Sequence, residues 1–300
     1  MSGYDTAILV QFLIVGLANG LVYSLIALGF TVIFNATRIL NFAQGSFVML
    51  GGMVTFAAVS QLGLPLWLGA LLGVALPTLA GAAIYGAVVV PMLRRQASLY
   101  IIILGLFGVH IVAENAALIG IASTGVGFPS FTRWPPFEFL GAQISWQVVW
   151  IALGAIVAMA ALNLFFRAAP AGKAMRAAAA NPVAARLVGI NVHRMALYSF
   201  ALSGALGGLG GLLTTPAQFT AFNVGLPYAL KGFAAAMIGG FGNIWGATVG
   251  GVIIGVLEAV SVAFVSTKYK DAVTFSLLIV ILLVRPTGLF GSLVEVEERS

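Results

Sequence analysis

Charged residues are scarce in this chain, and cysteine is absent. Of its 300 residues, 14 are Lys or Arg and 8 are Asp or Glu, which makes 7% of the chain charged. Soluble domains carry about 25% charged residues, so this composition cannot build a water-facing surface. The lack of cysteine excludes disulfides, thiolate metal sites and cysteine nucleophiles.

The motifs of several enzyme classes are also missing. The chain has no G-x-x-x-x-G-K-[ST] phosphate-binding loop, since Gly172-Lys173 is followed by Ala174. It has no H-E-x-x-H zinc motif and no G-x-S-x-G nucleophile motif. We therefore expect a chain that is not an enzyme and has no cofactor of its own. Its energy source is expected to be another polypeptide or an ion gradient.

Apolar sequence fills the chain instead: 61% of the residues are hydrophobic and the mean hydropathy is +1.10. A membrane span needs about 20 apolar residues, and it must be helical because lipid cannot satisfy free backbone groups. The candidate runs are 7–34, 42–62, 64–90, 100–122, 146–166, 196–216, 229–240, 244–265 and 272–284. We predict an all-α polytopic membrane protein, one domain over residues 1–300, with about eight or nine membrane helices.

Basic residues set the orientation of these helices and account for the net charge of +6 without a nucleic-acid partner. Successive connections between spans alternate between the two sides of the membrane. The connections that hold Arg38, Arg94 and the basic residues of 167–195 all fall on one side, which the positive-inside rule identifies as the cytoplasm. The N-terminus is then outside. The C-terminus is cytoplasmic if the chain is broken near 229–251, where Gly239–Gly251 holds six glycines.

The connection 167–195 stands out because it has five basic residues and no acidic residue. Pro170 suits the first turn of an alanine-rich helix. Asn181 and Pro182 predict the N-cap and first position of a second short helix. Gly189 predicts that this helix ends with a residue in the left-handed backbone conformation. Two capped helices outside the membrane indicate a surface for a cytoplasmic partner. The alternative is that the charges serve topology alone.

This segment resembles the cytoplasmic coupling loop of ABC importer permeases of the branched-chain amino acid (LivH/LivM-type) family, closest to the LivH type. The family pattern G-x-A-x-R-A, followed by A-A-x-x-x-G-I-N, is present as Gly172, Ala174, Arg176, Ala177, Ala184, Ala185, Gly189, Ile190 and Asn191, with Arg186 inside it. Asn181 occupies a position that is often acidic in the family. Gly20–Gly45 resembles the first-helix signature and its N-F-A-H-G turn, with Gln44 in place of the histidine, and Gly239–Gly251 resembles the late glycine motif.

The resemblance implies a permease subunit in a bacterial inner membrane. The implied partners are a second permease subunit of the LivM type, two cytoplasmic ATPases that hold ATP and Mg, and an extracytoplasmic binding protein. The implied substrates are branched-chain or other hydrophobic amino acids, with urea, amides or small organic acids as alternatives. An alternative from another class is a stand-alone secondary transporter driven by an ion gradient.

Two interruptions of the helices are candidates for a substrate pathway, since broken helices expose backbone groups to substrates. The candidate residues are Asn41, Phe42, Gln44, Gly45, Gly239, Gly240 and Gly242. The alternative, that both interruptions are tight-packing turns, stays open. Glycines 204, 207, 208 and 211 are expected to serve helix packing.

Three ionisable residues are expected at membrane depth, where such groups are functional candidates. His110 and Glu114 are spaced to pair on one helical face, as a structural pair or, less favoured, as a proton relay and ion-coupling site. Glu258 lies late in its span and is expected to reach the outer interface.

Overall fold

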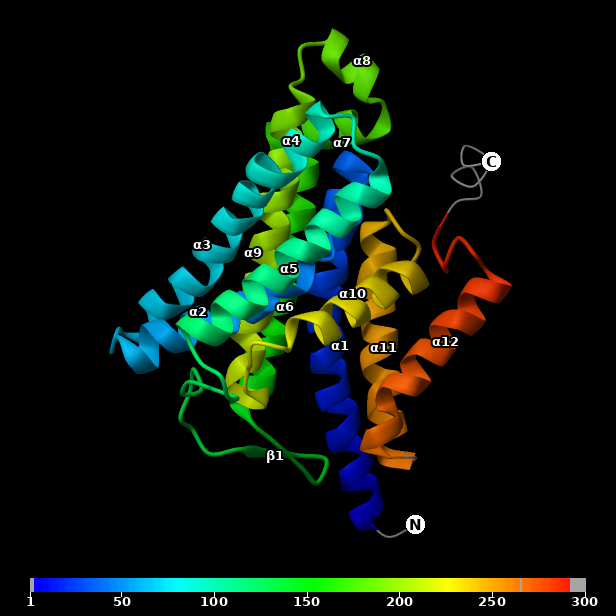
Figure 1. The fold of residues 1–300 in the computed structure, drawn as a ribbon. Coiled ribbons are helices and arrows are strands. Elements are labelled where there is room, and N and C mark those ends of the chain that lie inside the picture. The colour runs from blue at the N-terminus through cyan, green and yellow to red at the C-terminus, as the bar shows by residue number, and fades with distance from the viewer. Residues whose placement is uncertain (1–2, 265, 292–300) are drawn as a thin grey trace.

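A computed structural model describes residues 3–264 and 266–291 as a bundle of helices (Figure 1). Six helices among these residues are long and apolar enough to cross a membrane. They are α1 (Gly3–Thr37), the continuous helix formed by α3 (Leu66–Ile84), η2 (Tyr85–Val89) and α4 (Val90–Arg94), α5 (Leu99–Gly120), α6 (Trp146–Ala168), α9 (Val192–Gln218) and α11 (Ile244–Phe264).

Three further apolar segments are helical but shorter. They are α2 (Gln44–Phe56), which continues into the π-helical turn η1 (Ala57–Gln61), then α10 (Gly225–Gly239), and α12 (Lys270–Val284), which follows the 3-10 turn η3 (Thr267–Tyr269). With the six long helices they confirm the predicted all-α polytopic membrane architecture.

Small residues allow these helices to pack closely. On α9, a side chain at Gly204 would collide with the backbone of Pro77 on α3, and one at Gly211 would collide with the backbone of Val48 on α2. Contacts of this kind bring helix backbones together where lipid provides no hydrophobic drive for association. The packing role predicted for the glycines of 204–211 is confirmed.

The predicted break in the passage 229–265 is also confirmed. α10 ends at Gly239 and α11 starts at Ile244, and the turn between them holds Gly240 and Gly242 at φ of +101° and +95°. Glycine adopts these angles without the strain that a side chain would add. The Asn35 side-chain amide, near the end of α1, donates a 2.8 Å hydrogen bond to the Gly242 carbonyl and fixes the turn there.

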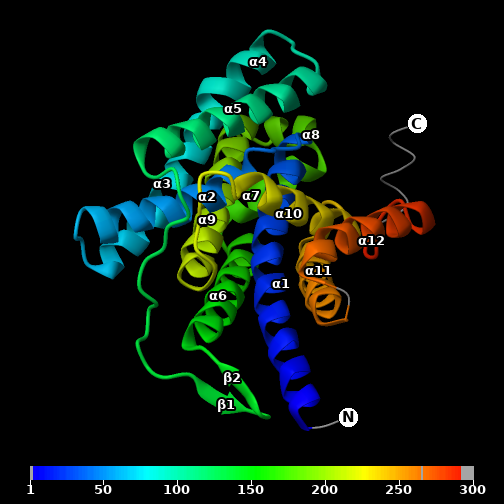
Figure 2. The ribbon, with the colours of Figure 1, turned by 60° about the horizontal axis from the view of Figure 1, so that its bottom comes forward.

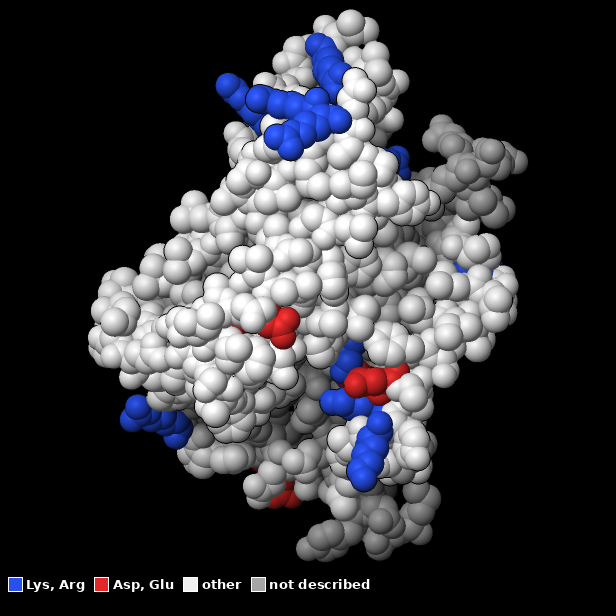
Figure 3. Space-filling model, viewed as in Figure 1, with Lys and Arg blue, Asp and Glu red and all other residues white. Residues whose placement is uncertain are grey.

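The molecule has two different ends (Figures 1 and 2). At one end lie α7 (Pro170–Ala180) and α8 (Pro182–Leu187), and lysines and arginines gather at this end of the molecule (Figure 3). At the other end the start of α1 lies near an antiparallel hairpin of β1 (Phe137–Phe139) and β2 (Ala142–Ile144), which the sequence analysis did not predict. After α12 the chain returns toward the α7–α8 end, where Phe290 lines the same cavity as Arg176 of α7. The predicted cytoplasmic C-terminus, residues 292–300, lies outside the described residues.

Candidate functional site

The basic connection forms the two short helices that its sequence predicts, and the second of them is capped. Pro170 opens α7, and the Asn181 side chain accepts hydrogen bonds from the backbone amides of Val183 (3.0 Å) and Ala184 (2.9 Å) to cap α8. Gly189 follows α8 with φ of +84°. Asn191 caps α9 by accepting a 3.0 Å hydrogen bond from the amide of Arg194. Neutral Asn181 therefore serves as the N-cap of α8.

The segment outside the long helices is shorter than predicted. Arg167 belongs to the last turn of α6, and α9 begins at Val192, so residues 169–191 form the connection. Gly172 lets α7 fold back on α6, because a side chain at this position would collide with the Phe165 carbonyl. Ala185 is buried where α8 meets the body of the protein, and Ile190 is partly buried against the same core. The pattern residues thus shape the backbone of the connection.

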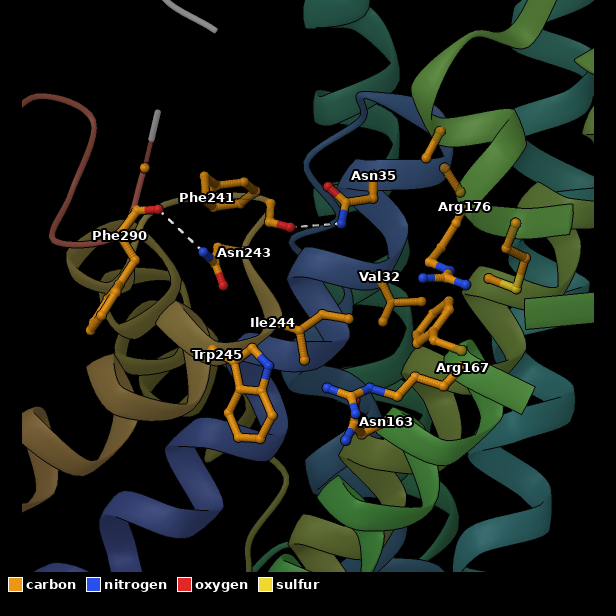
Figure 4. A pocket seen from close by; sticks show the side chains of 16 residues that line it. Val32, Asn35, Asn163, Arg167, Arg176, Phe241, Asn243, Ile244, Trp245 and Phe290 are labelled. Carbon is orange, nitrogen blue, oxygen red and sulfur yellow. Dashed lines mark hydrogen bonds between the residues drawn. The ribbon is translucent and has the colours of Figure 1, made fainter. Parts of the chain in front are cut away.

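The tip of this connection is apolar and exposed. Val183, Leu187 and Val188 are 67%, 84% and 76% exposed, and Arg186 is exposed beside them. Large apolar side chains grouped on a protruding tip indicate a surface that binds another protein. We call Val183, Arg186, Leu187 and Val188 the α8 tip. The sequence analysis selected Arg186 but missed its apolar neighbours. Arg176, also selected, points into a cavity beside Arg167 (Figure 4).

The first interruption, between α1 and α2, is densely packed. Asn41 and Gln44 are buried, and Gln44 is hydrogen-bonded to the Ser203 hydroxyl and to the Ser203 carbonyl of α9. Gly45 meets the backbone of Gly225, the first residue of α10. Phe42 is only partly buried. This interruption therefore contacts the start of α10.

The second interruption lies at the other end of α10. Gly239 packs against the backbone of Gly246, and the turn at 240–243 follows. Gly45 and Gly239 therefore contact opposite ends of the 15-residue α10, about 21 Å of helix apart. Phe42 of the first interruption reaches farther along α10, where its ring lies beside that of Phe233.

A row of aromatic rings connects the two interruptions along α1 and α10. Phe42 lies 5.7 Å from Phe233 between ring centroids, and Phe233 lies 5.8 Å from Phe241. Phe30 and Phe34 of α1 approach the row at 6.0 Å from Phe233 and 4.6 Å from Phe241. We call these five residues the aromatic row. It forms an apolar contact between α1, α10 and the two turns that the sequence analysis did not identify, apart from Phe42.

His110 and Glu114 are close together, as predicted, with 3.6 Å between Nε2 and Oε2. The other ring nitrogen, Nδ1, is 2.7 Å from the Ser46 hydroxyl of α2. His110 is 1% exposed, whereas the Glu114 side chain is 26% exposed. His110 thus ties α5 to α2 next to the first interruption.

The expectation for Glu258 is wrong. Glu258 does not reach the outer interface but is buried, with its Oε1 2.6 Å from Nζ of Lys231 and its Oε2 accepting a 2.7 Å hydrogen bond from the Tyr23 hydroxyl. Lys231, in α10, is a further buried ionisable residue, which the sequence analysis missed. Its Nζ is also 3.0 Å from Asp271 of α12, whose side chain is 53% exposed. One cation therefore joins α10, α11 and α12.

Comparison with known proteins identifies the family to which this chain belongs. Residues 12–282 match the family described as the permease component of branched-chain amino acid transport systems. The chain is 35% identical over 295 residues to the high-affinity branched-chain amino acid transport system permease protein LivH of Salmonella typhimurium, covering 92% of this chain and 93% of that protein. It is 34% identical over 303 residues to LivH of Escherichia coli K12, covering 92% and 93%. It is 30% identical over 303 residues to the corresponding protein BraD of Pseudomonas aeruginosa, covering 94% and 95%. No solved structure matches.

Proposed function

The chain belongs to the family of branched-chain amino acid transport permeases, and from this premise we propose that it is the membrane-spanning subunit of an ATP-driven importer of branched-chain or other hydrophobic amino acids. The observation that carries the proposal is the α8 tip, an exposed apolar and basic surface on a capped helix outside the long helices. A transporter that works alone has no use for such a surface.

The proposal assigns the energy source to partner subunits. The sequence contains no G-x-x-x-x-G-K-[ST] loop, so ATP and Mg belong to two cytoplasmic ATPases that dock at the α8 tip. A second permease chain of the LivM type completes the membrane pathway, and an extracytoplasmic binding protein delivers the amino acid. Closure of the ATPases then pushes on α7 and α8 and changes the accessible side of the pathway.

We propose that the amino acid side chain passes along the aromatic row, with the helix interruptions at its ends. Aromatic and aliphatic walls suit a hydrophobic side chain. The dipoles of the helix ends suit the carboxylate and ammonium groups without a fixed charge. Relatives named for branched-chain amino acids support this substrate class over urea, amides or small organic acids.

Replacement of Leu187 with aspartate is expected to weaken ATPase binding by about tenfold or more, as for the loss of a central interface residue. Leu187 is 84% exposed, so the fold should remain. The measurement is co-purification of the ATPases, together with ATP-driven leucine uptake by proteoliposomes that hold all the partner subunits. An unchanged melting temperature of the variant chain is the control. Uptake by this chain alone, driven by an ion gradient, would instead establish a secondary transporter.

The proposed orientation places α7 and α8 in the cytoplasm and the β1–β2 hairpin outside. Because the chain has no cysteine, single cysteines report their side of the membrane without background. Glu138→Cys in the hairpin should react with a membrane-impermeant thiol reagent in intact cells, whereas Val188→Cys in the α8 tip and Arg285→Cys after α12 should react only in inverted vesicles. The opposite labelling pattern contradicts the proposed orientation.

A further inference from the structure

Helix α5 crosses the front of the molecule in Figure 1 and meets the rest of the bundle along one side only. Its buried residues recur at helical spacing and are Ile102, Leu106, His110 and Ala117. The opposite side of the helix carries a second row at spacings of three and four residues, formed by Leu104, Gly108, Val112, Asn115 and Ile119. We call these five residues the outer face of α5.

The described residues, 3–264 and 266–291, leave this face uncovered. Leu104 and Val112 are each 69% exposed, and Ile119 is 86% exposed. A side chain added at Gly108 would meet nothing within 4 Å. Lipid tails and the apolar side of another membrane helix would cover these apolar residues equally well, so the polar residues decide what the face contacts.

Asn115 is exposed on the outer face and lies about 8 Å of helix before the end of α5, inside the candidate span Leu99–Gly120. Its side-chain nitrogen donates a 2.9 Å hydrogen bond to the Ile111 carbonyl of the same helix, and its side chain makes no other hydrogen bond to the described residues. Lipid tails offer no partner to its second N–H or to Oδ1. Asparagine side chains in membrane helices bond instead to a neighbouring helix.

Glu114 places a carboxylate beside this face. The six candidate spans contain one other acidic residue, Glu258, which is buried and paired with Lys231. The Glu114 side chain is 26% exposed, and its partner among the described residues is His110, with 3.6 Å between Nε2 and Oε2. Ionisable residues inside membrane helices face protein or enclosed water rather than lipid. The side of α5 that carries Asn115 and Glu114 therefore needs a polar partner from another chain.

We infer that the outer face of α5 packs against a transmembrane helix of the second permease subunit, which supplies hydrogen-bond donors to Asn115 and to the Glu114 carboxylate. The inference rests on the proposed function, which requires a second permease chain in the same membrane. Gly108 lets the two backbones approach closely, as small residues do between membrane helices. Behind the contact, His110 lies between Glu114 and the Ser46 hydroxyl of α2. Docking of the second permease therefore acts on the start of α2, next to the first interruption.

The test uses the absence of cysteine, which lets a single spin label report the surroundings of one position. Val112→Cys labels the outer face of α5, and Leu164→Cys, at a residue of α6 that is 64% exposed, is the matched control. Each full-length chain is reconstituted in liposomes alone and as a pair with a cysteine-free LivM-type permease. Electron paramagnetic resonance measures collisions with oxygen, which dissolves in lipid, and with a water-soluble nickel chelate. Pairing should remove most oxygen collisions at Val112 without adding nickel collisions, and should leave Leu164 unchanged.

Retained oxygen collisions at Val112 in a purified pair overturn the inference, because the two permeases then meet through another face. New nickel collisions would place the face on water, and protection in the chain alone would assign it to a second copy of this chain, so both results also overturn it. Absence of the second permease from the purified complex would contradict the proposed function itself, and co-purification separates that failure from the failure of this face.

Two substitutions test the contact directly. Asn115→Leu should weaken binding of the second permease by about threefold, the usual effect of one hydrogen bond between membrane helices, and Gly108→Leu should weaken it at least as much by holding the backbones apart. Gly86→Leu is the matched control, because a side chain there also meets nothing within 4 Å. The melting temperature of each variant chain alone should equal that of the wild type, since Asn115 is exposed and Gly108 has open space beside it. Wild-type binding by both variants overturns the inference.

Discussion

Replacement of Lys231 with methionine is expected to destabilise the chain by about 3–5 kcal/mol, the usual effect of removing one partner of a buried ion pair. The Lys231 and Glu258 side chains are 9% and 8% exposed. Without the ammonium group, buried Glu258 keeps only the Tyr23 hydroxyl as a partner among the described residues. The melting temperature of the detergent-solubilised chain should fall sharply, and leucine uptake should fall with it.

The double variant Lys231→Met with Glu258→Gln tests whether the unpaired charge of Glu258 causes the loss of stability. It removes both charges and leaves an amide at the Tyr23 hydroxyl, so most of the lost stability should return. Lys268→Met is the matched control, because Lys268 is exposed and its loss should leave the melting temperature unchanged. Equal melting temperatures for the wild type and Lys231→Met would show that the pair contributes nothing to stability.

The contacts of Lys231 could not be predicted from the sequence. Its partners Glu258 and Asp271 lie on α11 and α12, and no local pattern connects positions so far apart. Hydropathy locates each helix because membrane depth dictates its length and composition. It does not determine which side chains of different helices meet. Glu258 was therefore assigned to the outer interface when its partner lies inside the bundle.

The features that were predicted correctly depend on neighbouring residues. Pro170, Asn181 and Gly189 act through backbone angles and hydrogen bonds within a few positions, and their roles follow from residue type alone. The α10–α11 break follows in the same way from its glycines. The hairpin at 137–144 and the π-helical turns carry no comparable local signal. The placement of Gly45 and Gly239 at opposite ends of α10 is likewise a feature of the tertiary structure.

Replacement of Gly239 with valine is expected to reduce leucine uptake by more than about tenfold through loss of packing between α10 and α11, since overpacking typically costs 1–3 kcal/mol. The new side chain would meet the backbone of Gly246, which helix movement alone can relieve. The Gly239 carbonyl also accepts a 3.1 Å hydrogen bond from the Phe290 amide, so the segment after α12 would move too. Gly86→Val is the matched control, because a side chain there meets nothing within 4 Å.

The melting temperature of the Gly239→Val chain decides between the two interpretations of the glycine turn. A packing turn predicts that stability and uptake fall together, because the collision strains the helix pair in every state of the transport cycle. A pathway residue predicts lost uptake with normal stability and normal ATPase binding, because only the passage of substrate is blocked. The packing of Gly239 on Gly246 favours the first outcome for Gly239 itself, whereas the proposed pathway ends at the neighbouring turn of residues 240–243. A stable, fully assembled and inactive Gly239→Val transporter would contradict the packing role and place Gly239 too on the substrate route.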